Sequence, residues 1–210
     1  MPDQKRFISF EGLDFSGKTT QINILLEKLR KSGYDVNFIR EPGGTEISEK
    51  IRQILLDKNN MQMTPLCEVL LYSAARHQLI HEKIVPALTA GNFVVTDRYL
   101  DSTTAYQGYG RQMPLAFINT LNNTVVENVN PALTIYLDIT LATLRKRKSS
   151  YHGETDRLEE QDDAFYQRVR KGYLKIAELD KKRIKIIDGV KSIEEIKSQI
   201  WELVITTFSL

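Results

Sequence analysis

Short, continuous apolar runs alternate along this chain with longer segments in which apolar residues recur every three or four positions. Continuous runs are typical of strands that helices cover on both faces, and the longer period is typical of the covering helices. The runs predict five strands, at Phe7–Glu11, Val36–Arg40, Phe93–Asp97, Leu133–Leu137 and Ile184–Ile187. The longer period predicts helices near Lys18–Lys31, Ile47–Leu56, Cys67–His81, Glu82–Ala90, Leu115–Val126, Leu141–Lys148, Asp163–Leu179 and Ile193–Thr206. This alternation indicates an α/β fold with a parallel sheet, whose ligands bind beyond the carboxyl ends of the strands.

Local signals mark where several of these helices begin and end. Gly33 and Gly91 stand at expected helix ends, and Ser192–Glu195 has the pattern of a capping box that opens the last helix. The 210 residues contain no internal repeat and no linker. We therefore expect one domain, residues 1–210.

The segment after the first strand matches a phosphate-binding loop, G-x-x-x-x-G-K-[ST], in full. Its glycines let backbone N–H groups turn toward phosphate oxygens at the start of a helix. Lys18 is expected to reach the β- and γ-phosphates, and the Thr19 hydroxyl is expected to ligate Mg²⁺. A chance glycine-rich turn is the alternative, but the strand, loop and helix stand in the order that the motif needs. The expected ATP-binding residues are Gly12, Leu13, Asp14, Phe15, Ser16, Gly17, Lys18, Thr19 and Thr20.

Two charged residues follow directly on the third apolar strand. Asp97 could hold water of the Mg²⁺ shell, and Arg98 could bridge the donor and acceptor phosphates. A structural Asp–Arg pair at the strand end is the alternative. A phosphate loop in the same sheet favours the functional interpretation.

Polar and aromatic residues that suit a second substrate follow other strands. One loop contains Arg40, Glu41 and Pro42. It could hold an acceptor sugar or phosphate, or it could simply make a turn. Tyr72 and Arg76 share a helix face, where a ring and a guanidinium could hold a flat base, although an aromatic at helical spacing is more often core. The segment after Arg98 adds side chains that suit the edge of a planar ring, or equally a helix followed by a turn: Ser102, Thr103, Tyr106 and Gln107.

Composition narrows the class of protein. The net charge of +2 is too small to indicate a nucleic-acid surface. The single cysteine, Cys67, excludes an internal disulfide and fits a reducing compartment. No signal peptide and no bilayer-length apolar segment is evident. We expect a cytoplasmic protein without a nucleic-acid or membrane partner.

Five motifs follow one another between Phe10 and Glu159: GLDFSGKTTQ, REPGGT, YSAARHQL, TDRYLDSTTAYQG and GETDRLE. In order and spacing they resemble the motifs of bacterial thymidylate kinases. The resemblance implies the P-loop NTPase fold, with a five-stranded parallel sheet flanked by helices and a lid at about residues 147–158. It also implies a homodimer and a reversible, Mg²⁺-dependent transfer of the ATP γ-phosphoryl group to dTMP.

The same resemblance assigns roles to acceptor residues by position. Tyr72 takes the place of the ring stacked on thymine, and Arg76 that of the arginine bonded to the base. Arg98 matches the arginine on the dTMP phosphate, Asp14 faces the sugar, and Tyr106 crowds its 2′ position. Further matching or contributing positions are Thr103, Gln107, Arg40 and Tyr173, and the Glu41–Pro42 peptide resembles one that is cis in the family.

The phosphate loop raises a question about charge, because Phe15 stands where some members of the family carry an arginine. The others carry it in the lid, so the lid is expected to supply the charge here. The expected catalytic cations, beside Lys18 and Arg98, are Arg157, which we favour for its D-R-[IL]-E context, Arg147 and Lys148. A solvated helix face is the alternative for this charge run.

Other kinds of protein remain as alternatives. A nucleoside kinase would need a carboxylate base, and Glu11 could serve. A GTPase-like switch would carry an N-K-x-D segment, which is missing. The scattered histidines and single cysteine show no zinc pattern, so we expect His77 and His81 to be ordinary helix residues.

Overall fold

One parallel sheet forms the centre of the protein, whose computed structural model describes residues 6–153 and 156–210. The strand order is β2-β3-β1-β4-β5. The strands are β1 (Phe7–Gly12), β2 (Val36–Arg40), β3 (Phe93–Asp97), β4 (Leu133–Asp138) and β5 (Ile184–Asp188). All five predicted strands are confirmed, and three of them run one residue longer than expected.

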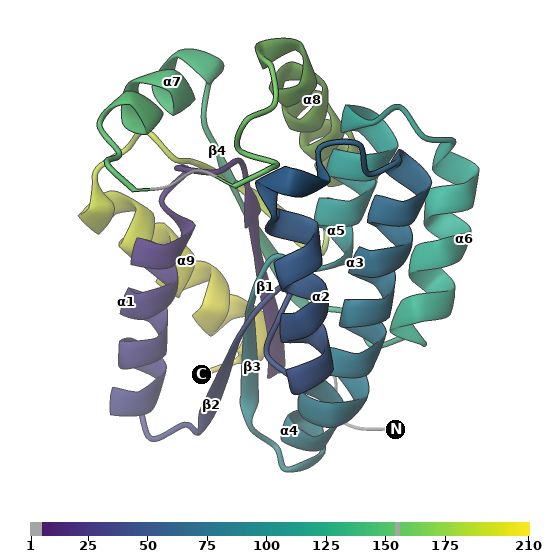
Figure 1. Ribbon diagram of the computed structural model, residues 1–210. Coiled ribbons are helices and arrows are strands. Elements are labelled where there is room, and N and C mark those ends of the chain that lie inside the picture. The colour runs from purple at the N-terminus through teal and green to yellow at the C-terminus, as the bar shows by residue number, and fades with distance from the viewer. Residues whose placement is uncertain (1–5, 154–155) are drawn as a thin grey trace.

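Helices cover both faces of the sheet (Figure 1). They are α1 (Lys18–Lys31), α2 (Glu46–Leu56), α3 (Pro65–Leu79), α4 (Val85–Thr89), α5 (Leu100–Thr103), α6 (Leu115–Val126), α7 (Leu141–Ser149), α8 (Asp163–Leu179) and α9 (Ile193–Phe208). A short 3₁₀ turn spans Lys58–Asn60. No helix among the described residues is long and apolar enough to cross a bilayer.

Alternate residues of each strand pack against opposite helix layers, which explains the continuous apolar runs. Ile8 and Phe10 of β1 lie in the cluster formed with α1 and α9. Phe7 of the same strand lies in a cluster with Leu79 and Ile84 on the other face. Each face therefore buries apolar area, and at about 25 cal/mol per Å² this burial is the main stabilising contribution.

Two segments differ from the predicted helices. The expected helices Cys67–His81 and Glu82–Ala90 are joined by a π-helical turn, Ile80–Ile84, in which the Val85 N–H donates to the Ile80 carbonyl. Pro86 explains part of this irregularity, because it has no N–H to continue the regular pattern. The second segment continues from α5 into a π-helical stretch, Thr104–Gly110. From the sequence, this segment suited either the edge of a planar ring or a helix followed by a turn, and neither interpretation predicted a π-helical stretch.

The predicted helix-end signals are confirmed. Gly33 and Gly91 have φ of 85° and 78°, in the left-handed region that glycine tolerates best. Ser192 Oγ accepts from the Glu195 N–H, and the Glu195 carboxylate accepts from the Ser192 N–H. The Glu41–Pro42 peptide is cis.

The strand register brings the ends of three strands together. Asp97 of β3 aligns with Arg40 of β2 and with Phe10 of β1, two residues before Gly12. Because all strands are parallel, the loops that follow them emerge at the same edge. The phosphate loop and the acceptor motifs therefore meet there.

Candidate active site

A cleft of about 530 Å³ lies at this carboxyl edge of the sheet. Its lining includes most of the site residues predicted from the sequence: Asp14 to Thr20, Arg40, Glu41, Pro42, Tyr72, Arg76, Asp97, Arg98, Ser102, Thr103, Tyr106, Gln107 and Arg147. Five of the predicted residues do not line it: Gly12, Leu13, Lys148, Arg157 and Tyr173. The cleft therefore joins the phosphate loop to the expected acceptor residues.

The phosphate loop connects β1 to α1, and its shape depends on Gly12. A Cβ at Gly12 would lie 2.6 Å from the Leu137 carbonyl oxygen, so no larger residue fits. Lys18 Nζ donates to the carbonyls of Gly12 (3.2 Å) and Leu13 (3.0 Å). Burial, reinforced by the charge of Arg98, lowers the pKa of the Lys18 ammonium. The ammonium lies over the loop, in position to bind an anion there.

Arg98 connects the loop to the acceptor side of the cleft. Its backbone φ of 73° is left-handed, which is uncommon for a residue with a side chain. The guanidinium pairs with Asp14 Oδ1 at 2.6 Å and donates to the Tyr106 hydroxyl at 3.1 Å. It also donates to the Gly12 carbonyl and to the Tyr173 hydroxyl. Tyr173 thus reaches the site indirectly, through Arg98 and through Ser102, whose hydroxyl lies 2.9 Å from the Tyr173 hydroxyl.

Burial and neighbouring charges have opposite effects on the pKa values of Arg98 and Asp14. Burial disfavours both charged forms. Neighbouring groups, among them the carboxylates of Asp14 and Asp97, outweigh that effect and raise the pKa of Arg98, while Arg98 and Lys18 lower the pKa of Asp14. Both groups are therefore charged at neutral pH. Both terminal nitrogens of Arg98 already donate to internal partners, so a phosphate that binds the guanidinium would replace some of those partners.

Glu11 lies fully buried beneath Arg98. Its carboxylate accepts from the Tyr99 N–H, the Ser102 hydroxyl and the Tyr173 hydroxyl at 2.6–2.8 Å. Burial, with the nearby charge of Asp101, raises the pKa of Glu11 to about 7. Glu11 is not part of the cleft lining, so it cannot take a proton directly from a substrate there. This placement argues against the nucleoside kinase alternative.

Asp97 and Thr19 fit a hydrated Mg²⁺. Both residues line the cleft, and Asp97 Oδ1 is buried without a hydrogen-bond partner in the part of the chain that the structure describes. A buried carboxylate oxygen is costly when unpaired. Oxygen ligands, partly through water, are what Mg²⁺ prefers.

Arg76 is held rigidly at the acceptor end of the cleft. Its Nε donates to Glu41 Oε2 and its Nη1 to the Thr103 hydroxyl, both at 2.7 Å, while its Nη2 donates to the Tyr99 carbonyl. Since a guanidinium has five N–H donors, two remain for a ligand. Tyr72, one turn earlier on α3, is half-buried and lines the same end. Arg76 therefore also braces the Glu41 loop.

Polar side chains complete this end of the cleft. Gln107 lines it and donates to Glu68 at 2.9 Å. Arg40 is exposed and lies 3.5 Å from Glu49. Its guanidinium is therefore accessible to an anionic substrate.

The three expected lid cations have different surroundings. Arg147, in the last turn of α7, donates to the carbonyls of Phe15 (2.9 Å) and Gly189 (2.8 Å). Lys148 donates to the Glu159 carbonyl. Arg157 is only 2% exposed and pairs with Glu68 at 2.7 Å. Arg147 is therefore the one of the three that lies at the phosphate loop, and our preference for Arg157 is not supported by its position.

Arg157 lies away from the phosphate loop because its partners are residues distant in sequence. Glu68 on α3 accepts from Arg111 and Gln107 as well as Arg157, so it forms a buried acidic centre that binds this guanidinium. The D-R-[IL]-E context carries no information about that partner. Residues 154 and 155, inside the expected lid of residues 147–158, lie outside the described residues.

Several cleft residues had not been assigned a role from the sequence: Arg52, Leu56, Tyr151, Asp156, Leu158 and Glu159. The last four lie in the expected lid or in the GETDRLE motif, whereas Arg52 and Leu56 had no sequence signal. Arg52 on α2 donates to the Pro42 carbonyl at 2.9 Å. The Tyr151 ring packs edge-on against Phe15, with centroids 5.3 Å apart. Arg52 adds a cation to the cleft. The sequence did not indicate this role, because Arg52 lies on helix α2, outside every motif.

The fold and the site together define a P-loop phosphotransferase, with a phosphate loop and a second anion-binding group across one cleft. A family profile described as thymidylate kinase matches residues 10–200. The chain belongs to the thymidylate kinase family.

Individual relatives agree with this assignment. A thymidylate kinase of Thermoanaerobacter pseudethanolicus is 44% identical over 199 residues, covering 95% of this chain and 97% of the relative. A thymidylate kinase of Kosmotoga olearia is 44% identical over 196 residues, covering 92% of each. The crystal structure of thymidylate kinase from Ehrlichia chaffeensis superposes with a TM-score of 0.78 at 33% identity, covering 94% of this chain and 97% of that one.

Replacing Arg157 by Met should affect stability and leave catalysis nearly unchanged. Removing one partner of a buried ion pair costs about 3–5 kcal/mol, and the low end is expected because Glu68 keeps Arg111. Urea unfolding monitored by circular dichroism measures the loss, and kcat is measured where the variant is folded. A stable variant whose kcat falls about 10³-fold, the scale of an arginine finger, would instead make Arg157 catalytic.

Proposed function

We propose that this chain catalyses the reversible transfer of the ATP γ-phosphoryl group to dTMP, giving dTDP and ADP for dTTP synthesis. The observation that carries the proposal is the single cleft in which the phosphate loop faces Arg98, Tyr72 and Arg76. The family to which the chain belongs supplies the identity of the acceptor. The reaction is therefore assigned from the cleft and the family together.

Catalysis in this cleft rests on position and charge. The attacking oxygen belongs to a phosphate that is already ionised at neutral pH, so no general base is needed. The largest requirement is to neutralise charge on the transferring group. Cations line the cleft for this purpose: Lys18, Arg40, Arg52, Arg76, Arg98 and Arg147.

On the donor side, the backbone of the phosphate loop holds the ATP phosphates and Lys18 reaches the transferring group. Arg147 supplies the charge that Phe15 does not. Its Nη1 lies 4.0 Å from where a Cβ on Gly17 would stand, so the guanidinium approaches the loop closely. Thr19 and Asp97 would hold Mg²⁺, which supplies additional positive charge to the phosphates.

On the acceptor side, Arg98 binds the dTMP phosphate and Asp14 fixes both Arg98 and the sugar. Tyr72 stacks on thymine, and the free N–H donors of Arg76 bond the base. The residues expected to complete the site are Arg40, Glu41, Pro42, Ser102, Thr103, Tyr106 and Gln107. Arg98 lies where the two sides meet, so it can hold the acceptor phosphate in line with the transferring group.

We also propose a single cytoplasmic domain that forms a homodimer through α2, α3 and α6, with a lid at residues 147–158. These helices lie side by side on the same side of the molecule (Figure 1). They carry exposed apolar side chains: Ile47, Ile54, Leu66, Leu70, Leu115 and Phe117. Exposed apolar side chains gathered on neighbouring helices are typical of an interface.

The decisive test is an acceptor panel with ATP and Mg²⁺ that contains dTMP, dUMP, dCMP, dGMP, UMP and thymidine. We expect dTMP to be the preferred acceptor and thymidine to be inert. Lys18→Ala serves as the control and should lower kcat by orders of magnitude, because it removes a cation aimed at the transferring group. ATP hydrolysis that no acceptor stimulates would refute the proposal.

Tyr72→Ala should raise the KM for dTMP at least tenfold and leave the KM for ATP nearly unchanged. Stacking of a base on an aromatic ring is worth about 1–3 kcal/mol. Steady-state kinetics with each substrate varied in turn measure both constants, and Tyr72→Phe is the control that keeps the ring. Equal KM values for dTMP in the wild type and Tyr72→Ala would remove Tyr72 from the base site.

Arg147→Ala should lower kcat by about 10³, the low end for an arginine that stabilises a transferring phosphoryl group. Binding of dTMP, measured by calorimetry, should change little because Arg147 lies on the donor side. Lys148→Ala is the matched control and should leave kcat close to that of the wild type, because Lys148 does not line the cleft and its ammonium donates to the Glu159 carbonyl rather than to the phosphate loop. A loss of dTMP affinity with kcat retained would contradict the assignment.

A further inference from the structure

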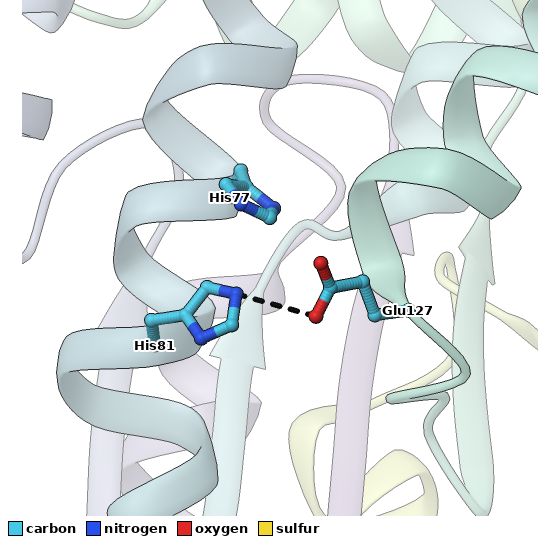
Figure 2. A group of neighbouring side chains, drawn as sticks. All are labelled: His77, His81 and Glu127. Atoms are coloured by element: carbon cyan, nitrogen blue, oxygen red, sulfur yellow. Dashed lines mark ion pairs between the residues drawn. The ribbon is translucent and has the colours of Figure 1, made fainter.

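Two histidines and a glutamate lie together where α3 meets α6. His77 is in α3 and His81 is in the π-helical turn that follows, whereas Glu127 caps the end of α6. Figure 2 shows both imidazoles projecting from successive turns toward the Glu127 carboxylate. Within residues 6–153 and 156–210, these are the three His, Cys, Asp or Glu side chains grouped closely enough to hold a metal ion.

The distances fit the ligands of one small cation. One ligand atom from each side chain lies within 4.8 Å of the other two. His81 Nε2 is 3.3 Å from Glu127 Oε2. Bonds of about 2.0–2.1 Å from zinc to nitrogen and oxygen place two ligands of a tetrahedron about 3.3–3.4 Å apart. The His81–Glu127 separation is therefore already that of two ligands of the same ion.

The hydrogen bond of His77 favours a ligand role. His77 Nδ1 lies 3.1 Å from the Val125 carbonyl oxygen. A carbonyl only accepts, so Nδ1 carries the proton and Nε2 keeps its lone pair. Metal-binding histidines usually donate their other ring N–H to such a carbonyl, which fixes the tautomer and the orientation of the ring.

We propose that His77, His81 and Glu127 form a site for a late first-row divalent cation, Zn²⁺ being the ion expected in the cell. Two imidazoles and one carboxylate are ligands that zinc accepts, with water in the fourth position. The half-exposed His81 and Glu127 side chains leave room for that water and for entry of the ion.

The ion would join α3 to α6 and would take no part in catalysis. None of the three residues lines the cleft. Since an ion that binds the folded chain and not the unfolded one stabilises the fold, its main effect is on unfolding. Sequence spacing gives no indication of this group, because Glu127 follows His81 only after β3, α5 and α6.

Zinc titration of the tag-free, full-length chain without nucleotide tests the proposal. Competition with a chromophoric zinc chelator measures affinity and stoichiometry. The wild type should bind one Zn²⁺ per chain, and its thermal unfolding midpoint should rise by several degrees. His81→Ala and Glu127→Gln should each weaken binding at least roughly tenfold, since even outer-shell substitutions at metal sites cost about 10–100-fold. Both replaced side chains are about half exposed, so the variants should fold.

Two control variants remove the other residues that zinc prefers. His152 is the remaining histidine of the sequence, and Cys67 is its single, exposed cysteine. His152→Ala and Cys67→Ser should bind zinc as the wild type does. No one-to-one uptake by the wild type, or equal affinity in His81→Ala and Glu127→Gln, would overturn the proposal.

Discussion

The ion pair between Arg98 and Asp14 connects the two halves of the cleft. Asp14 belongs to the phosphate loop after β1, and Arg98 follows the adjacent strand β3, so the pair joins the donor side to the acceptor side at 2.6 Å. Glu11, Ser102 and Tyr173 lie beneath the guanidinium and bond to one another. Because the pair is partly buried and has several further partners, Arg98 is pre-oriented before a substrate binds, and little reorganisation is left for the reaction.

The cleft gathers more cationic than anionic side chains, which is costly in the free protein and useful when phosphates bind. Burial lowers the pKa of Lys18, whereas the pKa of Asp14 falls because Arg98 and Lys18 outweigh its burial. Arg76 is neutralised by Glu41, with both side chains almost fully buried. Charged phosphates would replace part of these internal partners, so binding of substrate relieves repulsion among the cations.

Helix α3 serves three parts of the molecule at once. Tyr72 and Arg76 face the cleft, Glu68 holds Arg157 and Arg111, and His77 faces α6. A substitution on one face of this helix can therefore change the stability of the fold without changing the catalytic rate. Replacing Tyr72 is therefore expected to weaken substrate binding, whereas replacing Arg157, the partner of Glu68, is expected to lower stability.

The sequence by itself determined the strands, most of the helices and the phosphate loop, because each depends on residues near one another in the chain. The hydrophobic period marks buried faces, and the glycines of the loop mark a backbone that side chains would block. The surroundings of charged side chains were decided only by the tertiary structure. Arg147 and Arg157 belong to the same basic and polar segment, yet one meets the Phe15 carbonyl and the other a buried carboxylate of α3. Long side chains take the partner that the packing of distant elements brings within reach, and no local pattern encodes that partner.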